Sequence, residues 1–308
     1  MSSAKAAGRG VAAGILSVLL WPASLWAADP LVSTDWVKGV VGRPGIAIVD
    51  LRLEPDYARN HIPGAVNLPT GQRGWQLGIQ GSPGGTPPET NFVNRVSALG
   101  IGNADHVVVV HAGKTVFDVA AATQVYWTFR YMGHAEISIM NGGMLEYSRR
   151  QPIPLDSAPV IRQPVAYRVQ LRPELLATTK DIRDAVAGQA TLVDNRDPPQ
   201  YLGINKDILI PRYGTLPKAH NNPVAWLTID GGGLIRSPNH LRAMYAYLGI
   251  PLEGPRIAFS NFGVLASLGW FISHELLASK NTRLYMPGLT EWMSDDGNPL
   301  DRRLNFDQ

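Results

Sequence analysis

Short apolar runs alternate with longer segments of helical pattern along most of the chain. Because these runs are apolar throughout instead of alternating with polar residues, they predict strands that are buried on both faces and covered by helices. Strands are expected at 46–51, 107–111, 137–140, 190–194 and 257–259, and helices at 91–99, 119–132, 179–187, 238–248 and 266–277. The pattern therefore predicts an α/β protein with central parallel sheets flanked by helices.

Two distant parts of the chain share one ordered pattern of residues. Segments 61–69 and 215–223 place Pro, Ala, Asn and Pro at identical spacing, and each segment follows an Asp-x-Arg triplet. A Gly-x-x-Glu-aromatic pattern then closes each part, at 143–147 and at 288–292. The period is far longer than a solenoid unit, so the pattern indicates a duplicated domain.

The two copies set the expected domain boundaries. We expect a first domain at 28–155, a proline-rich linker at 156–174 and a second domain at 175–308. Residues 1–27 resemble a secretory signal, with Lys5 and Arg9 ahead of a short apolar run and a cleavage site after Ala27. The protein is therefore expected to be periplasmic or secreted, with an uncleaved anchor as the alternative.

Composition narrows the possible partners. Without Lys5 and Arg9 the formal net charge falls from +3 to +1, which gives no electrostatic footprint for nucleic acid, and no membrane contact is expected after signal removal. The seven histidines show no metal-binding spacing, so neither a metal nor a cofactor is predicted. The chain contains no cysteine, so core packing must stabilise it without disulfides.

One strand–loop–helix segment carries the strongest chemical signal. The predicted strand 257–259 ends at Ser260, a loop with Gly263 follows, and an apolar helix begins near Ala266. Ligands of parallel α/β sheets lie beyond such strand ends, so the loop amides are expected to point inward at Ser260 and hold a small anion. His111 ends the corresponding strand of the first copy, where a structural role is favoured.

The sequence resembles the tandem-domain rhodanese (thiosulfate sulfurtransferase) family over about residues 35–300. The resemblance rests on features that occur in the family order: the Asp-x-Arg triplets, the turn at 61–69, the loop at 260–266 and the closing Glu-Trp. The family loop reads Cys-x-x-Gly-x-x-Ala, and Ser260 stands at its cysteine position. The resemblance implies a silent first domain and a second domain whose thiolate takes sulfur from thiosulfate as a persulfide. It also implies that Phe262 and Gln200 stand at positions where the family often has cations.

The substitutions bear directly on activity. A serine alcohol has no comparable anionic fraction without an adjacent base and forms no labile persulfide. We therefore expect a cysteine-less homologue that binds a small anion, a sulfur compound or a periplasmic protein partner. The candidate residues are Ser260 at the catalytic position and, for binding, Arg196, Gln200, Asn261, Phe262, Gly263, Val264 and Leu265.

Several alternatives stay open at this point. The protein could be a thiosulfate sulfurtransferase, above all if the serine at 260 replaces a natural cysteine. A serine hydrolase using Ser260 has less support, because Ala258 departs from the Gly-x-Ser-x-Gly pattern and no pairing with His274 can be read from sequence. Arg196 has two equally supported roles, as an anion ligand or as the partner of a neighbouring carboxylate.

Overall fold

The computed structural model describes residues 28–70, 88–149 and 153–304. The predicted signal segment, 1–27, lies outside the described residues. None of the helices in the described ranges is long and apolar enough to cross a membrane.

The first sheet is entirely parallel. Within the described residues it has five strands in the order β1-β5-β4-β2-β3. These strands are β1 (Leu31–Val32), β2 (Ile46–Asp50), β3 (Val66–Asn67), β4 (His106–Val110) and β5 (Ile137–Met140). Residues 107–110 of the central strand β4 are fully buried, which explains their uniformly apolar sequence.

The second sheet repeats this arrangement on a smaller scale. In the described part of the chain it has four parallel strands in the order β7-β6-β8-β9. These are β6 (Thr191–Asp194), β7 (His220–Asn221), β8 (Arg256–Phe259) and β9 (Thr282–Leu284). The α/β class with two parallel sheets, expected from the sequence, is confirmed.

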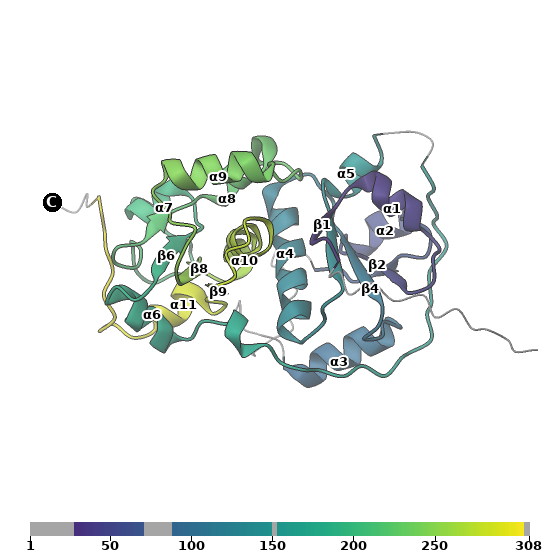
Figure 1. The fold of residues 1–308 in the computed structure, drawn as a ribbon, viewed down its shortest axis with the longest axis horizontal. Coiled ribbons are helices and arrows are strands. Elements are labelled where there is room, and N and C mark those ends of the chain that lie inside the picture. Colours follow the sequence, from purple (N-terminus) through teal and green to yellow (C-terminus); the bar gives the residue numbers. More distant parts are fainter. Residues whose placement is uncertain (1–27, 71–87, 150–152, 305–308) are drawn as a thin grey trace, which may run out of the picture.

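Helices cover both faces of each sheet (Figure 1). The first unit contains α1 (Thr34–Val40), α2 (Glu54–Arg59), α3 (Glu89–Ala98), α4 (Val116–Tyr131) and α5 (Gly143–Tyr147). The second contains α6 (Thr179–Val186), α7 (Pro198–Leu202), α8 (Val224–Leu227), α9 (Pro238–Tyr247), α10 (Val264–Trp270) and α11 (Gly288–Trp292). Along β4, Val107 and Val109 belong to the same hydrophobic cluster as buried residues of α3 and α4. Val108 and Val110 belong to a second cluster, together with buried residues of α1 and α5.

The two units meet through α4 and α10, which lie side by side at the centre of the molecule (Figure 1). One hydrophobic core runs through this contact and includes Trp127 of α4 and Trp270 of α10. The hydroxyl groups of Thr123 and Ser267 lie 2.9 Å apart across it. The inner faces of the two sheets thus share a single core.

Matching hydrogen bonds confirm the internal repeat. The Tyr57 hydroxyl donates to the Ala65 carbonyl at 2.7 Å, and the Tyr201 hydroxyl donates to the Ala219 carbonyl at 2.8 Å. The side-chain amide of Asn67 donates to the carbonyls of an Asp-x-Arg triplet, and Asn221 does the same in the second unit. The shared residues therefore build the same turn beside β2 and beside β6.

The five predicted helices form with shifted bounds, and two of them differ most from the prediction. The α4 helix begins three residues before the predicted start, because Thr115 and Asp118 form a reciprocal capping box at its N-terminus. The predicted helix 266–277 begins earlier, at Val264, and its α-helical part ends at Trp270. A π-helical turn, Phe271–Leu276, continues it.

Candidate functional site

Ser260 follows β8 directly and is almost completely buried, with 1% of its surface exposed. Its hydroxyl donates to the Phe262 carbonyl at 3.3 Å and accepts a hydrogen bond from the Ala266 amide at 3.2 Å. The loop after β8 and the first turn of α10 therefore hold the hydroxyl between them. Both partners are backbone groups, so neither can act as a general base.

The rest of the loop does not converge on Ser260 as predicted. The Gly263 amide donates to the Met286 carbonyl at 2.8 Å, and the Val264 amide donates to the Phe262 carbonyl. A Cβ atom at Gly263 would lie 2.3 Å from the Met286 sulfur, so the loop packs too closely there for any other residue. The Ala266 amide donates to the hydroxyl as predicted, whereas the Gly263 amide points to Met286, so the prediction is wrong for Gly263.

Arg196 takes the structural role that the sequence left open. It is 1% exposed, and its guanidinium donates to both carboxylate oxygens of Asp194, with a shortest distance of 2.6 Å. The remaining donors reach the Gly214 carbonyl at 2.9 Å and the Asn261 side-chain oxygen at 3.2 Å. Thr215 donates to the same Asp194 carboxylate at 2.7 Å. These interactions occupy Arg196 inside the protein and leave it unavailable to a ligand.

The buried ion pair of Arg196 and Asp194 holds the loop 260–266 in place through Asn261. The Asn261 side-chain oxygen accepts from Arg196, and its amide nitrogen donates to the Gln200 side chain at 2.7 Å. The Asn261 carbonyl also accepts from Thr290, through both the backbone amide and the hydroxyl. The loop is therefore tied to α7 on one side and to α11 on the other.

A cavity of about 610 Å³ opens beside Ser260, between the two units. Six of the predicted site residues line it, whereas Arg196 and Gly263 do not. The six are Gln200, Ser260, Asn261, Phe262, Val264 and Leu265. We call this cavity the Ser260 cleft.

The other lining residues give the Ser260 cleft an apolar and acidic character. Phe117 from α4 and Trp226 from α8 line it, and 58% and 45% of their respective surfaces are exposed. Asp197 and Asp207 are the charged residues of the lining, and none of the described residues that line it is Lys or Arg. Carboxylates repel anions, so the lining argues against the small anion that the sequence suggested.

Sequence reasoning missed these additional lining residues. Asp207 lies in a loop, and Phe117 and Trp226 belong to different units of the fold. No motif or spacing connects them, because only the packing of α4 against α10 brings the two units together. A signal existed only for the loop 260–266, where local sequence and local geometry coincide.

The hydrolase alternative loses its support at this site. His274 does not contact Ser260; its ring stacks on Trp270 with centroids 4.6 Å apart, and its Nδ1 lies 3.3 Å from Glu275 Oε1. Within the described residues, no carboxylate, imidazole or amine lies within hydrogen-bonding distance of the Ser260 hydroxyl. An unassisted serine alcohol is a poor nucleophile.

Sequence comparisons agree with this fold. A rhodanese-like domain model matches residues 33–150. A protein of Haloferax volcanii named "Putative thiosulfate sulfurtransferase" is 28% identical over 90% of this chain and 98% of its own length. The "Sulfur carrier protein TtuD" of Thermus thermophilus is 29% identical over 88% of this chain and 96% of its own length.

Solved structures extend the likeness over both units. SseA from Escherichia coli, from a study of 3-mercaptopyruvate sulfotransferases, matches with a TM-score of 0.71 and 22% identity, covering 85% of this chain and 99% of that one. The anaerobic ergothioneine biosynthesis enzyme from Chlorobium limicola, in complex with trimethyl histidine, matches with a TM-score of 0.74 and 18% identity, covering 90% of this chain and 71% of that one. Likeness at such identities shows the fold alone. Residues 33–150 therefore form a rhodanese-like domain, and the chain as a whole is a rhodanese-fold, sulfurtransferase-like protein whose sequence contains no cysteine.

Proposed function

We propose that this protein binds an organic sulfur compound in the Ser260 cleft and does not transfer sulfur from it. The observation that carries the proposal is the replacement of a thiol by a buried hydroxyl whose hydrogen-bond partners are backbone groups. Sulfur transfer of the rhodanese kind needs a sulfur nucleophile that can be regenerated. Ser260 supplies neither the sulfur atom nor a base that would activate its oxygen.

The lining supports an uncharged or cationic organic ligand. A volume of about 610 Å³ lies within the range of small-molecule sites, and the aromatic faces of Phe117, Trp226 and Phe262 offer apolar contact. Aromatic rings beside carboxylates attract cations, and Asp197 and Asp207 supply the carboxylates. A dianion such as thiosulfate would meet repulsion and find no lining cation.

Export is a further part of the proposal. It rests on the basic and apolar pattern of residues 1–27, which resembles a secretory signal. With the sulfur compounds named for its relatives, this pattern supports a role in sulfur metabolism outside the cytoplasm. Detection of the mature protein, beginning after Ala27, in a periplasmic or culture fraction would test this part separately.

Ligand discrimination tests the binding proposal. We would titrate the purified protein by calorimetry with thiosulfate and with ergothioneine, an organic sulfur compound that carries a quaternary ammonium group. We expect ergothioneine to bind and thiosulfate to give no measurable heat. Trp226→Ala should weaken ergothioneine binding about tenfold, because an aromatic contact with a cation is worth roughly 1–2 kcal/mol.

The matched control is Tyr247→Ala, which removes an aromatic ring that is 88% exposed and does not line the cleft. That variant should bind like the unmodified protein. Preferential binding of thiosulfate would contradict the proposal, and so would ergothioneine binding that Trp226→Ala leaves unchanged.

A further inference from the structure

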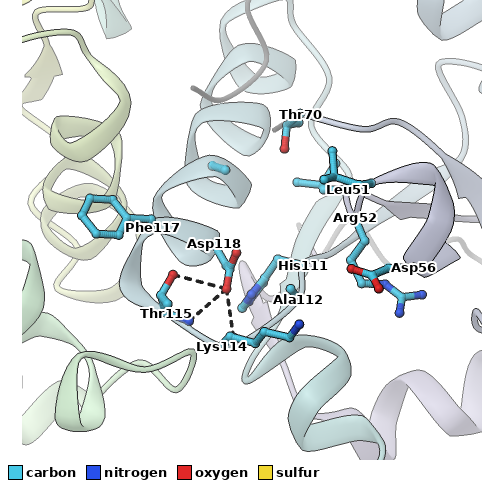
Figure 2. A pocket seen from close by; sticks show the side chains of 12 residues that line it. Leu51, Arg52, Asp56, Thr70, His111, Ala112, Lys114, Thr115, Phe117 and Asp118 are labelled. Carbon is cyan, nitrogen blue, oxygen red and sulfur yellow. Dashed lines mark hydrogen bonds between the residues drawn. The ribbon is translucent and has the colours of Figure 1, made fainter. Parts of the chain in front are cut away.

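A second cavity lies in the first unit, beyond the carboxyl ends of β2 and β4. Its volume is about 580 Å³, and residues from both strand ends and from the first turns of α4 line it (Figure 2). We call it the His111 cavity. It occupies the place in the first unit that corresponds to the Ser260 cleft, but its polar residues differ.

His111 is the most unusual residue of this cavity. It is 2% exposed, and neither ring nitrogen makes a hydrogen bond of good geometry within the described part of the chain. A Cβ atom at Gly143 would lie 2.8 Å from Nδ1, so the backbone at the start of α5 packs against that side of the ring. Figure 2 shows the imidazole beside Asp118 at the cavity wall.

The imidazole is neutral at physiological pH. Burial lowers the pKa of His111 to about 4, and the nearby Asp118 carboxylate and Met140 carbonyl only partly oppose this shift. A neutral ring carries one donor and one acceptor. A buried ring nitrogen without a hydrogen bond of good geometry is unfavourable, and a bound partner would recover part of that cost.

The charges around the cavity leave one cation available. Arg52 is paired with Asp50 at 2.6 Å, and Asp56 is paired with Arg59 at 3.1 Å. The Asp118 carboxylate accepts hydrogen bonds from the backbone amides of Lys114 and Thr115, as the cap of α4. Among the described lining residues, the Lys114 ammonium is therefore the one charge without an ion-pair partner or a capping role.

We propose that the His111 cavity binds a small organic carboxylate. The Lys114 ammonium pairs with the carboxylate group of this ligand. The imidazole of His111 and the hydroxyl of Thr70 offer hydrogen bonds from the lining, and Leu51, Leu53 and Phe117 contact the apolar body of the ligand.

The cavity dimensions favour an organic acid over an inorganic ion. A cavity of this size is typical for a small molecule, and bare sulfate or phosphate would leave most of it filled by water. The amides of Lys114 and Thr115 already hydrogen-bond to Asp118, so these two amides cannot also hold an oxyanion. Among the side chains of the lining, recognition then rests on Lys114 and on the imidazole of His111.

The His111 cavity and the Ser260 cleft share a wall. Phe117 lines both, whereas Trp226 lines only the cleft and His111 only the cavity. Substitutions at Trp226 and at Lys114 therefore separate the two sites, and the result at one does not decide the result at the other.

Binding of phenylacetate, acetate and the uncharged analogue phenylacetamide to the full protein tests the proposal. Nuclear magnetic resonance would follow the imidazole signals of His111 and the backbone amides of residues 111–118. We expect phenylacetate to shift these signals in a saturable manner, and we expect acetate and phenylacetamide to bind more weakly. Lys114→Gln should weaken phenylacetate binding about threefold to fivefold, as expected for a partly exposed ion pair.

His111→Gln keeps hydrogen-bonding capacity but changes its geometry, and it should also weaken phenylacetate binding. Trp226→Ala should leave it unchanged. Two results would overturn the proposal: His111 signals that do not respond to either acid, or equal affinity for phenylacetate in the unmodified protein and in Lys114→Gln. If His111→Gln does not fold, the His111 signals of the unmodified protein and the Lys114→Gln comparison still decide the question.

Discussion

The guanidinium of Arg196 donates a hydrogen bond to the side-chain oxygen of Asn261 at 3.2 Å, and this contact joins the end of β6 to the loop after β8. The ion pair of Arg196 with Asp194 is buried beneath it. Arg196, for which binding an anion was one of two expected roles, therefore supports the loop 260–266 from the protein interior. The first unit has the same kind of pair, between Arg52 and Asp50, without a serine loop above it.

Substitution of Arg196 should therefore impair stability. Arg196→Met leaves the Asp194 carboxylate buried without its cation, so we expect the free energy of unfolding to fall by about 3–5 kcal/mol. Arg183→Met is the matched control, because its side chain is 56% exposed and lies 3.9 Å from an exposed Asp295. Denaturant unfolding should show a change below about 0.5 kcal/mol for the control. Similar losses in both variants would refute the structural role of Arg196.

One pair of hydroxyl groups should contribute measurably to the contact between the units. Thr123 and Ser267 lie 2.9 Å apart across α4 and α10, and both are fully buried. A double-mutant cycle of Thr123→Val and Ser267→Ala should give a coupling energy of about 1 kcal/mol. Thr128→Val provides the control, because that hydroxyl donates to the Gln124 carbonyl within α4 and should add independently to Ser267→Ala. A coupling near zero for the first pair would show that the hydroxyls do not interact.

Stability should depend on pH through Glu275, which is 7% exposed. Burial raises the pKa of Glu275, but the hydrogen bonds and charges of His274 and Lys280 outweigh it and bring the pKa to about 2, below the ordinary 4.5. Because the folded-state pKa is the lower one, this stabilisation is present above about pH 4.5 and is lost as the pH falls toward 2.

Glu275→Gln isolates that contribution. The difference in unfolding free energy between the unmodified protein and Glu275→Gln should shrink by roughly 3 kcal/mol as the pH falls from 4.5 toward 2. Urea unfolding of both proteins at matched pH values measures it. A difference that stays constant over this interval would contradict the lowered pKa.

Much of the fold could be predicted from the sequence, because local pattern and tertiary environment agree there. Residues 107–110 are apolar throughout and occupy the centre of a sheet, and the repeated Pro-x-Ala-x-Asn-x-Pro segments form equivalent turns. The sequence analysis did not identify β3 and β7, because two-residue strands have no periodicity to detect. They exist through pairing with β2 and β6.

The candidate site was less predictable, since several of its properties depend on distant residues. The sequence located Ser260 and five other lining positions, but the direction of the Gly263 amide is set by Met286, which follows β9. Likewise, the acidic lining arises from Asp197 and Asp207, which belong to no motif. The loop of His111 could be aligned with that of Ser260, yet the unpaired state of its ring depends on the packing of α5.

Ser260→Cys should produce a thiol without a strongly lowered pKa. One backbone amide points at this position, the site is buried, and the cleft carries two carboxylates, so we expect a thiol pKa at or above about 8.5. Adding Phe262→Lys places a cation in the same lining and should lower it. The rate of alkylation against pH measures both values. A thiol pKa well below about 8.5 in the single variant would show that the loop amides do stabilise an anion.

The most direct test of the central claim is the formation of thiocyanate from thiosulfate and cyanide by the unmodified protein, Ser260→Ala and Ser260→Cys. Mass spectrometry after exposure to thiosulfate would detect any sulfur atom retained by each protein. We predict no thiocyanate and no retained sulfur for the unmodified protein and for Ser260→Ala. Ser260→Cys supplies the missing sulfur nucleophile, but it should retain sulfur only slowly, because the acidic lining repels thiosulfate. Thiocyanate formation by the unmodified protein that Ser260→Ala abolishes would contradict the claim that this site binds without transferring sulfur.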